Sequence, residues 1–283
     1  MTRFSIGAEQ EQTPFETEPY DSWVSPDGEC QCEFHRTTSG FLLRFPDQAD
    51  FLVEPEAGRA TGWPSIFGDR SAVQKLFDNS IVPLLGNYDG GLFLHGSAVQ
   101  TQCGAAAFLG HSRSGKTTLA GSFARSGQPF MTEDVVDLAG DGEGYVVRSK
   151  TSALRLFKDS AEHLLGRSIG FDQESGKQSI EAEKVLPFAH GVAKLAAIFV
   201  LGNDHGAPLN VRPQPAGVAL PLLLPHAFIL DVEDRPRLRE HFGRLAELAE
   251  RVPVFALDYP REYSVLPQVR SAILSAIQKD STE

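Results

Sequence analysis

The sequence is poor in cysteine and has no long apolar run, and both shortages narrow the class of protein. It contains 3 cysteines in 283 residues, an odd number that does not indicate a disulfide framework. No apolar run approaches the roughly 18 residues that span a bilayer. The first residues are acidic and lack an apolar signal core. We therefore expect a cytoplasmic protein that is not inserted in a membrane.

Positive charge is also scarce. The formal net charge is −11 at pH 7, with 26 Lys and Arg against 37 Asp and Glu. A surface of this sign repels phosphate backbones, which argues against nucleic acid as a partner. A nucleotide site would have to be locally basic. The composition, 41% hydrophobic and 22% charged, is that of an ordinary globular protein.

Short strand-like and helix-like segments are mixed along the chain, which predicts an α/β fold. Residues 1–85 predict a small β-rich unit of hairpins with a helix whose start is capped by Asp69 or Ser71. Residues 86–283 predict the larger domain. In that domain, two strands joined by a tight turn precede a helix that ends near Gly127.

The second of these strands runs into "GHSRSGKTT", residues 110–118. This segment fits G-x-x-x-x-G-K-[ST], the loop that cradles nucleotide phosphates, at Gly110, Gly115, Lys116 and Thr117. Backbone N–H groups of such a loop turn inward, and the next helix adds partial positive charge. We expect Lys116 to contact the β- and γ-phosphates of ATP and Thr117 to bind Mg²⁺. The other loop residues expected at the nucleotide are Ser112, Arg113, Ser114 and Thr118.

Such a loop needs an acidic residue nearby to hold Mg²⁺, and two places supply one. Glu133 and Asp134 follow the strand that is predicted after the helix of the loop, and Asp204 follows a later buried strand. Because the carboxyl ends of parallel strands share one edge of a sheet, we expect Glu133 and Asp134 on the phosphate side. Asp204 is the alternative, and Glu133 and Asp134 could instead form a solvated turn.

The histidine of "FLHGSAV" is a second candidate for chemistry. If the two strands pair across a turn centred on Gln102 and Cys103, His95 lies opposite Gly110, at the start of the loop. An imidazole there can accept a proton or donate a hydrogen bond to a phosphoryl oxygen. The alternative is a histidine packed in the core of the sheet.

Three segments, "FLHGSAV", "GHSRSGKTT" and "MTEDVV", together resemble the catalytic domain of the HPr kinase/phosphorylase family. In that family, a strand carrying "HG" precedes the phosphate loop and an acidic pair follows its helix. Three others, "FLLRFPDQADFLVEP", "SALRLFKDS" and "RVPVFALDYPR", look like the HPr kinase-like proteins of lasso-peptide gene clusters. The resemblance covers roughly residue 35 to the end and is most specific in the loop.

The resemblance implies a P-loop kinase domain related to phosphoenolpyruvate carboxykinase, with a small β-rich N-terminal unit. It implies that His95 and Lys116 are catalytic. The family has Asp-Asp where this chain has Glu133 and Asp134. We expect Asp134 to lie nearest the accepting hydroxyl, as the base, and Glu133 to be linked to the metal. Two exposed candidates for phosphate or substrate contact, which could also be plain surface charges, are Arg155 and Lys177.

The implied function is transfer of phosphate from ATP, with Mg²⁺, to a serine hydroxyl of a small lasso-type precursor peptide. Two alternatives are a serine kinase for an HPr-type carrier protein and a nucleotide-dependent peptide-binding protein without kinase activity. Since HPr kinases assemble into oligomers, the resemblance also allows a homo-oligomer.

Overall fold

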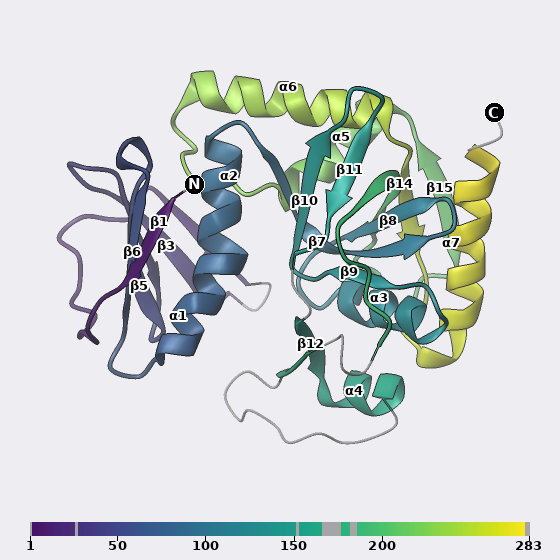
Figure 1. Cartoon of the computed structure of the whole chain (residues 1–283), viewed down its shortest axis with the longest axis horizontal. Helices are drawn as coiled ribbons and strands as arrows, with labels where there is room; N and C mark the ends of the chain where they lie inside the picture. Colours follow the sequence, from purple (N-terminus) through teal and green to yellow (C-terminus); the bar gives the residue numbers. More distant parts are fainter. Residues whose placement is uncertain (1, 26–27, 151–152, 166–176, 182–185, 281–283) are drawn as a thin grey trace. The chain divides into compact units, whose positions relative to one another are not determined.

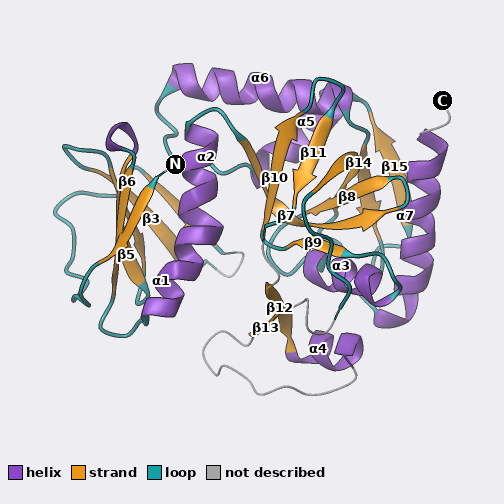
Figure 2. Ribbon diagram, in the orientation of Figure 1, coloured by secondary structure: helices purple, strands orange, loops and turns teal. Residues whose placement is uncertain are grey.

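The chain forms two compact units in a computed structural model that describes residues 2–25, 28–150, 153–165, 177–181 and 186–280. Unit 1 comprises Met1–Gly86 with Leu230–Glu233, and unit 2 comprises Asn87–Ile229 with Asp234–Glu283. Sheets and helices occur in a mixed α/β arrangement (Figures 1 and 2). No helix in the described part of the chain is long and apolar enough to cross a bilayer.

Unit 1 is built on one six-stranded sheet in the order β1-β6-β5-β4-β3-β2. Neighbouring strands from β2 to β6 pair antiparallel, and β1 pairs parallel with β6. This connectivity is that of the hairpins predicted from the sequence. The strands are β1 Arg3–Ile6, β2 Asp21–Val24, β3 Cys30–Arg36, β4 Phe41–Phe45, β5 Ala49–Glu54 and β6 Arg59–Pro64, with a 3₁₀ turn at Pro55–Ala57.

The helix predicted after this sheet is present but changes pitch in the middle. It begins with α1 (Arg70–Leu76), and the Asp69 side chain caps it by accepting a hydrogen bond from Ala72 N at 2.7 Å. A π-helical segment, Phe77–Ile81, leads into α2 (Val82–Tyr88). Pro83 explains the wider turn, because it has no N–H to donate and its ring would collide with the preceding turn of a regular α-helix.

Unit 2 contains an eight-stranded mixed sheet in the order β11-β10-β7-β8-β14-β16-β15, with β9 also beside β7. Strand β11 pairs with β14 as well, so the path β11-β10-β7-β8-β14 closes on itself. Only β8, β14 and β16 run parallel to one another among these pairs. The strands are β7 Leu92–Thr101, β8 Gly104–Leu109, β9 Phe130–Thr132, β10 Val135–Gly140, β11 Tyr145–Arg148, β14 Val192–Leu201, β15 Asn210–Gln214 and β16 Val254–Asp258.

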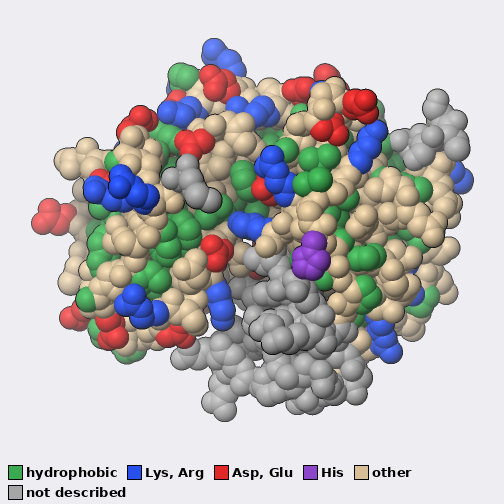
Figure 3. Space-filling model, viewed as in Figure 1, with side chains coloured by type: hydrophobic (Ala, Val, Ile, Leu, Met, Phe, Trp, Pro, Cys, Tyr) green, Lys and Arg blue, Asp and Glu red, His purple; other side chains and the backbone are tan. Residues whose placement is uncertain are grey.

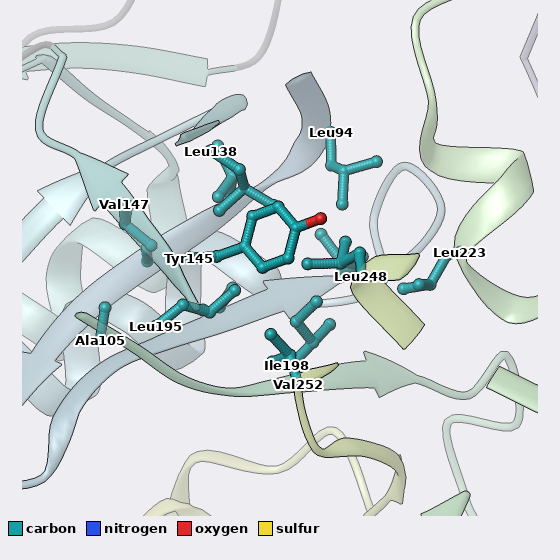
Figure 4. Close-up of a cluster of buried hydrophobic side chains, with 14 of the residues drawn as sticks. Leu94, Ala105, Leu138, Tyr145, Val147, Leu195, Ile198, Leu223, Leu248 and Val252 are labelled. Atoms are coloured by element: carbon teal, nitrogen blue, oxygen red, sulfur yellow. The ribbon is translucent and has the colours of Figure 1, made fainter. Parts of the chain in front are cut away.

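Helices cover both faces of this sheet because its central strands are apolar on both sides. Alternate residues of β8 enter two different clusters. Phe108 packs with Phe123 of α3, and Leu109 belongs to the cluster of Leu223 and Leu248, shown in Figure 4. The helices are α3 Lys116–Arg125, α4 Lys158–Leu165, α5 Ala216–Leu223, α6 Arg235–Arg251 and α7 Leu266–Asp280, with 3₁₀ turns at Leu224–His226 and Tyr263–Val265.

One predicted helix is partly wrong. The apolar spacing of residues 154–166 favours a helix, but the chain first forms β12 (Ala153–Phe157) and turns helical only at α4. Strand β12 pairs antiparallel with β13 (Lys177–Glu181), a partner that is distant in sequence. Long-range pairing therefore overrides the local preference at this segment. Helix α3 ends at Arg125 as expected, and Gly127 follows with φ 96°.

Acidic and basic side chains are interspersed over the face of the molecule drawn in Figure 3, with apolar side chains between them. Charges of mixed sign leave no large field of one sign on this face.

Phe108 lies near the end of β8, and a mutation there measures how much the packing of the sheet core stabilises unit 2. Its side chain is fully buried, with ring centroids 5.5 Å from Phe123 and 6.1 Å from Phe199. Phe108→Ala should lower the free energy of unfolding of unit 2 by about 3–5 kcal/mol, because it removes contacts and leaves a cavity. Denaturant titration followed by circular dichroism measures this. Phe242→Ala, at a side chain 44% exposed on α6, should cost less than about 1 kcal/mol; equal losses would contradict the packing.

Candidate functional site

The loop between β8 and α3 has the backbone that the motif requires. Gly110 and Arg113 have positive φ angles of 156° and 64°. A Cβ on Gly110 would lie 2.6 Å from Ser114 Oγ, so a larger residue would force the loop open. Gly115 is the N-cap of α3 and also has a positive φ, 95°. The loop therefore turns its backbone toward the N-terminus of a helix, as an anion site does.

Lys116 is held over this loop by the loop itself. Its side chain is buried, and Nζ donates hydrogen bonds to Gly110 O at 2.8 Å and His111 O at 2.9 Å. These two carbonyls fix the ammonium at the entrance of the loop. A positive charge in that position is suited to the terminal phosphates of a nucleotide.

Thr117 and Glu133 bring a hydroxyl and a carboxylate together beside the loop. Thr117 Oγ1 donates to Glu133 Oε1 at 2.8 Å, and Glu133 is only 4% exposed. The burial contradicts a solvated turn at Glu133. Two hard oxygen donors suit Mg²⁺, which usually completes its shell with substrate phosphates and water. The described residues contain no group of three or more His, Cys, Asp or Glu side chains able to hold a metal by themselves.

The predicted register of the hairpin β7–β8 is confirmed. The ladder runs from Thr101↔Gly104 to Gly96↔Leu109, so the next step places His95 beside Gly110. Glycine is needed after the histidine, because a Cβ on Gly96 would lie 2.5 Å from Leu109 Cδ2 and 2.7 Å from the Phe108 carbonyl. In the "HG" pair, His95 therefore supplies the polar side chain, and Gly96 allows β7 and β8 to approach closely.

The acidic pair lies in a different setting from the one predicted. We expected Glu133 and Asp134 at the end of a strand within a parallel unit, but the chain continues as β10 after them, and both β9 and β10 pair antiparallel with β7. The pair is a kink in this long strand, at the level of His95, which pairs with Val135. The acid pair therefore reaches the loop because its strand pairs antiparallel with β7, and not because it shares the carboxyl edge of parallel strands with the loop.

The kink is centred on Asp134, whose φ is 62°. Val135 N donates to Glu133 O at 2.7 Å, an i+2 to i bond that closes a tight γ-type turn. The Asp134 carbonyl accepts from Gly96 N at 3.2 Å and from His95 Nδ1 at 3.0 Å. Because a carbonyl only accepts, Nδ1 of His95 carries the hydrogen, and the lone pair of the neutral ring is on Nε2. A strained non-glycine backbone held by several bonds is a common feature of functional sites.

The other residues predicted at the site differ from one another in burial and in their contacts. Asp204, the alternative acid, is exposed and accepts from Gly206 N at 2.9 Å, as a residue that caps its own turn does. Ser112 and Arg113 are exposed, and Ser114 is buried. The Thr118 hydroxyl lies 3.0 Å from Ser160 Oγ on α4.

Arg155 and Lys177 lie on β12 and β13, where Arg155 pairs with Ser179 and Lys177 with Phe157. The segment "ESGKQS" around Lys177 has the polar composition of a loop, but Lys177 is the first residue of strand β13. The side chains of Arg155 and Lys177 fall outside the described part of the structure.

Sequence reasoning missed Arg261, which braces the phosphate loop from the C-terminal part of the chain. Its guanidinium donates to the carbonyls of Ser114 at 2.8 Å, Tyr259 at 2.7 Å and Gly202 at 2.8 Å. It also stacks on the Tyr259 ring at 3.9 Å. Burial lowers the pKa of Arg261, yet arginine stays charged in proteins. One side chain thus links the loop to the ends of β14 and β16, and an arginine in "DYPR" carries no local signal of that role.

Two further histidines lie near the loop and were not singled out from the sequence. His111, in the loop, and His226, in the 3₁₀ turn after α5, have ring centroids 5.5 Å apart. Burial, and after it the charges of His95, Lys116 and His111, lower the pKa of His226 to about 3.

A comparison with solved structures gives the following structural likeness. The chain is similar to the structure of the Hpr(Ser) kinase/phosphatase from Coxiella burnetii, with a TM-score of 0.40 and 12% sequence identity over 67% of this chain and 98% of that one. No protein-family model matches the sequence, and neither does any curated protein. A similarity of this size carries no argument about activity, which has to come from the site itself.

The brace predicts that Arg261→Gln weakens ATP binding about tenfold, because the loop carbonyl of Ser114 loses its donor. Arg261→Lys should weaken it nearly as much, since a lysine keeps the charge but lacks the planar fork. Isothermal titration calorimetry measures both. Arg212→Gln removes an exposed arginine that pairs with Asp258 at 2.8 Å and should leave the affinity unchanged. Full affinity in Arg261→Gln would show that the loop holds its shape without the brace.

Proposed function

We propose that the protein transfers the terminal phosphate of ATP to a serine hydroxyl of a small peptide. One observation carries the proposal: β7 is paired on one side with the strand that enters the phosphate loop and on the other with the strand that contains the acid pair. His95 lies between them. A nucleotide-binding protein without chemistry would need the loop but no acid pair beside it.

In this proposal the loop and Lys116 bind and orient the phosphates. The backbone N–H groups and the start of α3 favour negative charge, and the ammonium, now bonded to two carbonyls, moves or extends its bonding to phosphate oxygens. The remaining loop residues, Ser112, Arg113, Ser114 and Thr118, surround the triphosphate.

Asp134 acts on the acceptor. Its carboxylate orients the serine hydroxyl and receives its proton as the new bond to phosphorus forms and the bond to the leaving ADP oxygen breaks. The γ-type turn restricts the backbone of Asp134, so the side chain starts from a fixed direction. In this proposal Nε2 of His95, whose Nδ1 donates to the Asp134 carbonyl, contacts the phosphoryl group or its acceptor.

Thr117 and Glu133 would hold Mg²⁺, because their oxygens already lie within hydrogen-bond distance of each other beside the loop. A bound Mg²⁺ supplies charge that stabilises the phosphoryl group during transfer. The Thr117 hydroxyl donates a hydrogen bond to the buried Glu133 carboxylate, which offsets part of the cost of burying that group.

The peptide acceptor rests on resemblance at the level of family and not on side-chain chemistry. The segments "FLLRFPDQADFLVEP" in unit 1 and "RVPVFALDYPR" around Arg261 look like the kinases of lasso-peptide clusters, which supports a serine near the C-terminus of a precursor peptide. Arg155 and Lys177 are proposed contacts for the phosphate or the peptide. We also propose that the protein forms homo-oligomers, because HPr kinases do so and the chain resembles them.

Mass spectrometry of a candidate precursor peptide, incubated with the protein, ATP and Mg²⁺, tests the acceptor. We expect phosphate on serine, and none with Lys116→Ala, which lacks the charge that binds the phosphates. Phosphate on an HPr-type carrier but not on the peptide would favour the carrier kinase. Binding of ATP and peptide with no transfer to either would favour the binding protein.

Asp134→Asn separates binding from chemistry. Asparagine has the same shape and tolerates a positive φ, so the fold and ATP affinity should stay unchanged. The rate of transfer should fall by about 10²–10⁴, the usual loss when a proton acceptor is removed. Calorimetry and single-turnover transfer measure the two quantities. Asp204→Asn, at the exposed turn, is the control and should transfer at the full rate; the opposite pattern would make Asp204 the functional acid.

A further inference from the structure

His226 reaches the loop from a part of the chain that the motif does not include. An isolated β-bridge joins Leu94 of β7 to Ala227, the residue that directly follows His226, so His226 lies beside this end of β7. His226 is 5% exposed, so its ring is held inside the protein and not in bulk solvent.

His111 completes the arrangement from the loop side. Its ring lies edge-to-face with that of His226, with centroids 5.5 Å apart. His95, His111 and Lys116 are all near enough for their charges to act on His226. Three imidazoles from three separate segments thus gather with the lysine that is expected at the terminal phosphates. We call His95, His111 and His226 the imidazole cluster.

Acidic and basic groups both stand at this loop, since Glu133 accepts from Thr117 Oγ1 and the backbone of Asp134 accepts from His95. The pKa of His226 is lowered by its burial and then by the basic groups His95, Lys116 and His111. Burial and nearby positive charge therefore disfavour the protonated form of the His226 ring. A phosphoryl group with two negative charges would reverse the balance and favour the protonated form of a buried imidazole.

We propose that His226 and His111 bind the terminal phosphate of ATP, together with His95, and that the imidazole cluster makes the site distinguish ATP from ADP. The inference rests on the proposed function, since it assigns residues to the nucleotide of that reaction. An ATP that reaches the cluster gains hydrogen bonds from imidazole N–H groups, and ADP lacks the oxygens to receive them. The proton that a ring gains on binding comes from the surrounding buffer.

The test compares ATP and ADP binding by calorimetry, with Mg²⁺, in two buffers of different ionisation enthalpy. The wild type should bind ATP more tightly than ADP and take up protons only with ATP, because only ATP places charge in the cluster. His226→Gln and His111→Gln should each reduce the ratio of the two affinities by about tenfold and remove most of the proton uptake. ADP affinity should change little.

His241→Gln is the matched control. His241 is buried in α6, and burial together with the charge of Arg244 lowers its pKa to about 4, so it is a second buried neutral histidine in the same unit. It should keep the wild-type affinity ratio and proton uptake. Thermal unfolding checks that His226→Gln folds; if it does not, His111→Gln decides, since His111 is exposed.

Two failures are distinguishable. Absence of ATP binding in the wild type would remove the proposed function and the inference together. Wild-type binding and transfer to peptide, with unchanged affinity ratio and proton uptake in His111→Gln and His226→Gln, would overturn the inference alone.

Discussion

The backbone pairing of β7 with two partners is the constraint on which the site depends. On one side, the ladder with β8 ends at Gly96↔Leu109 and delivers the phosphate loop; on the other, Val135↔His95 delivers the acid pair. A shift of one residue in either ladder would turn His95 to the opposite face of the sheet. The register is secured by packing on both faces, since alternate residues of β8 enter different apolar clusters.

Side-chain hydrogen bonds, and not apolar packing, hold the backbone of the loop in place. The loop carbonyls are bonded by Lys116 from within and by Arg261 from the C-terminal segment, and Thr117 is bonded to Glu133. The kink at Asp134 is held by its own carbonyl, which accepts from two donors on β7. Buried polar groups that are bonded in this way preserve geometry in the absence of a ligand.

Lys116 and the imidazole cluster gather at the loop of a chain whose net charge is −11. Burial and the neighbouring basic groups disfavour the protonated form of His226, so its ring is neutral near pH 7. In the proposed reaction, the terminal phosphate would favour the protonated form. The overall negative charge is no obstacle to binding, because the field at short range is set by the nearest groups.

The sequence by itself determined the features that depend on local chemistry. It predicted the loop from Gly110 to Thr117, Asp69 as one of two candidate caps and the register of the β7–β8 hairpin, because glycine spacing, a capping side chain and a short turn act within a few residues. Only the tertiary structure decided that β12 is a strand, that the acid pair is a kink in an antiparallel strand, and that Arg261 and His226 reach the loop. Those contacts join segments far apart in the chain, and a single arginine or histidine carries no periodic signal of its distant partner.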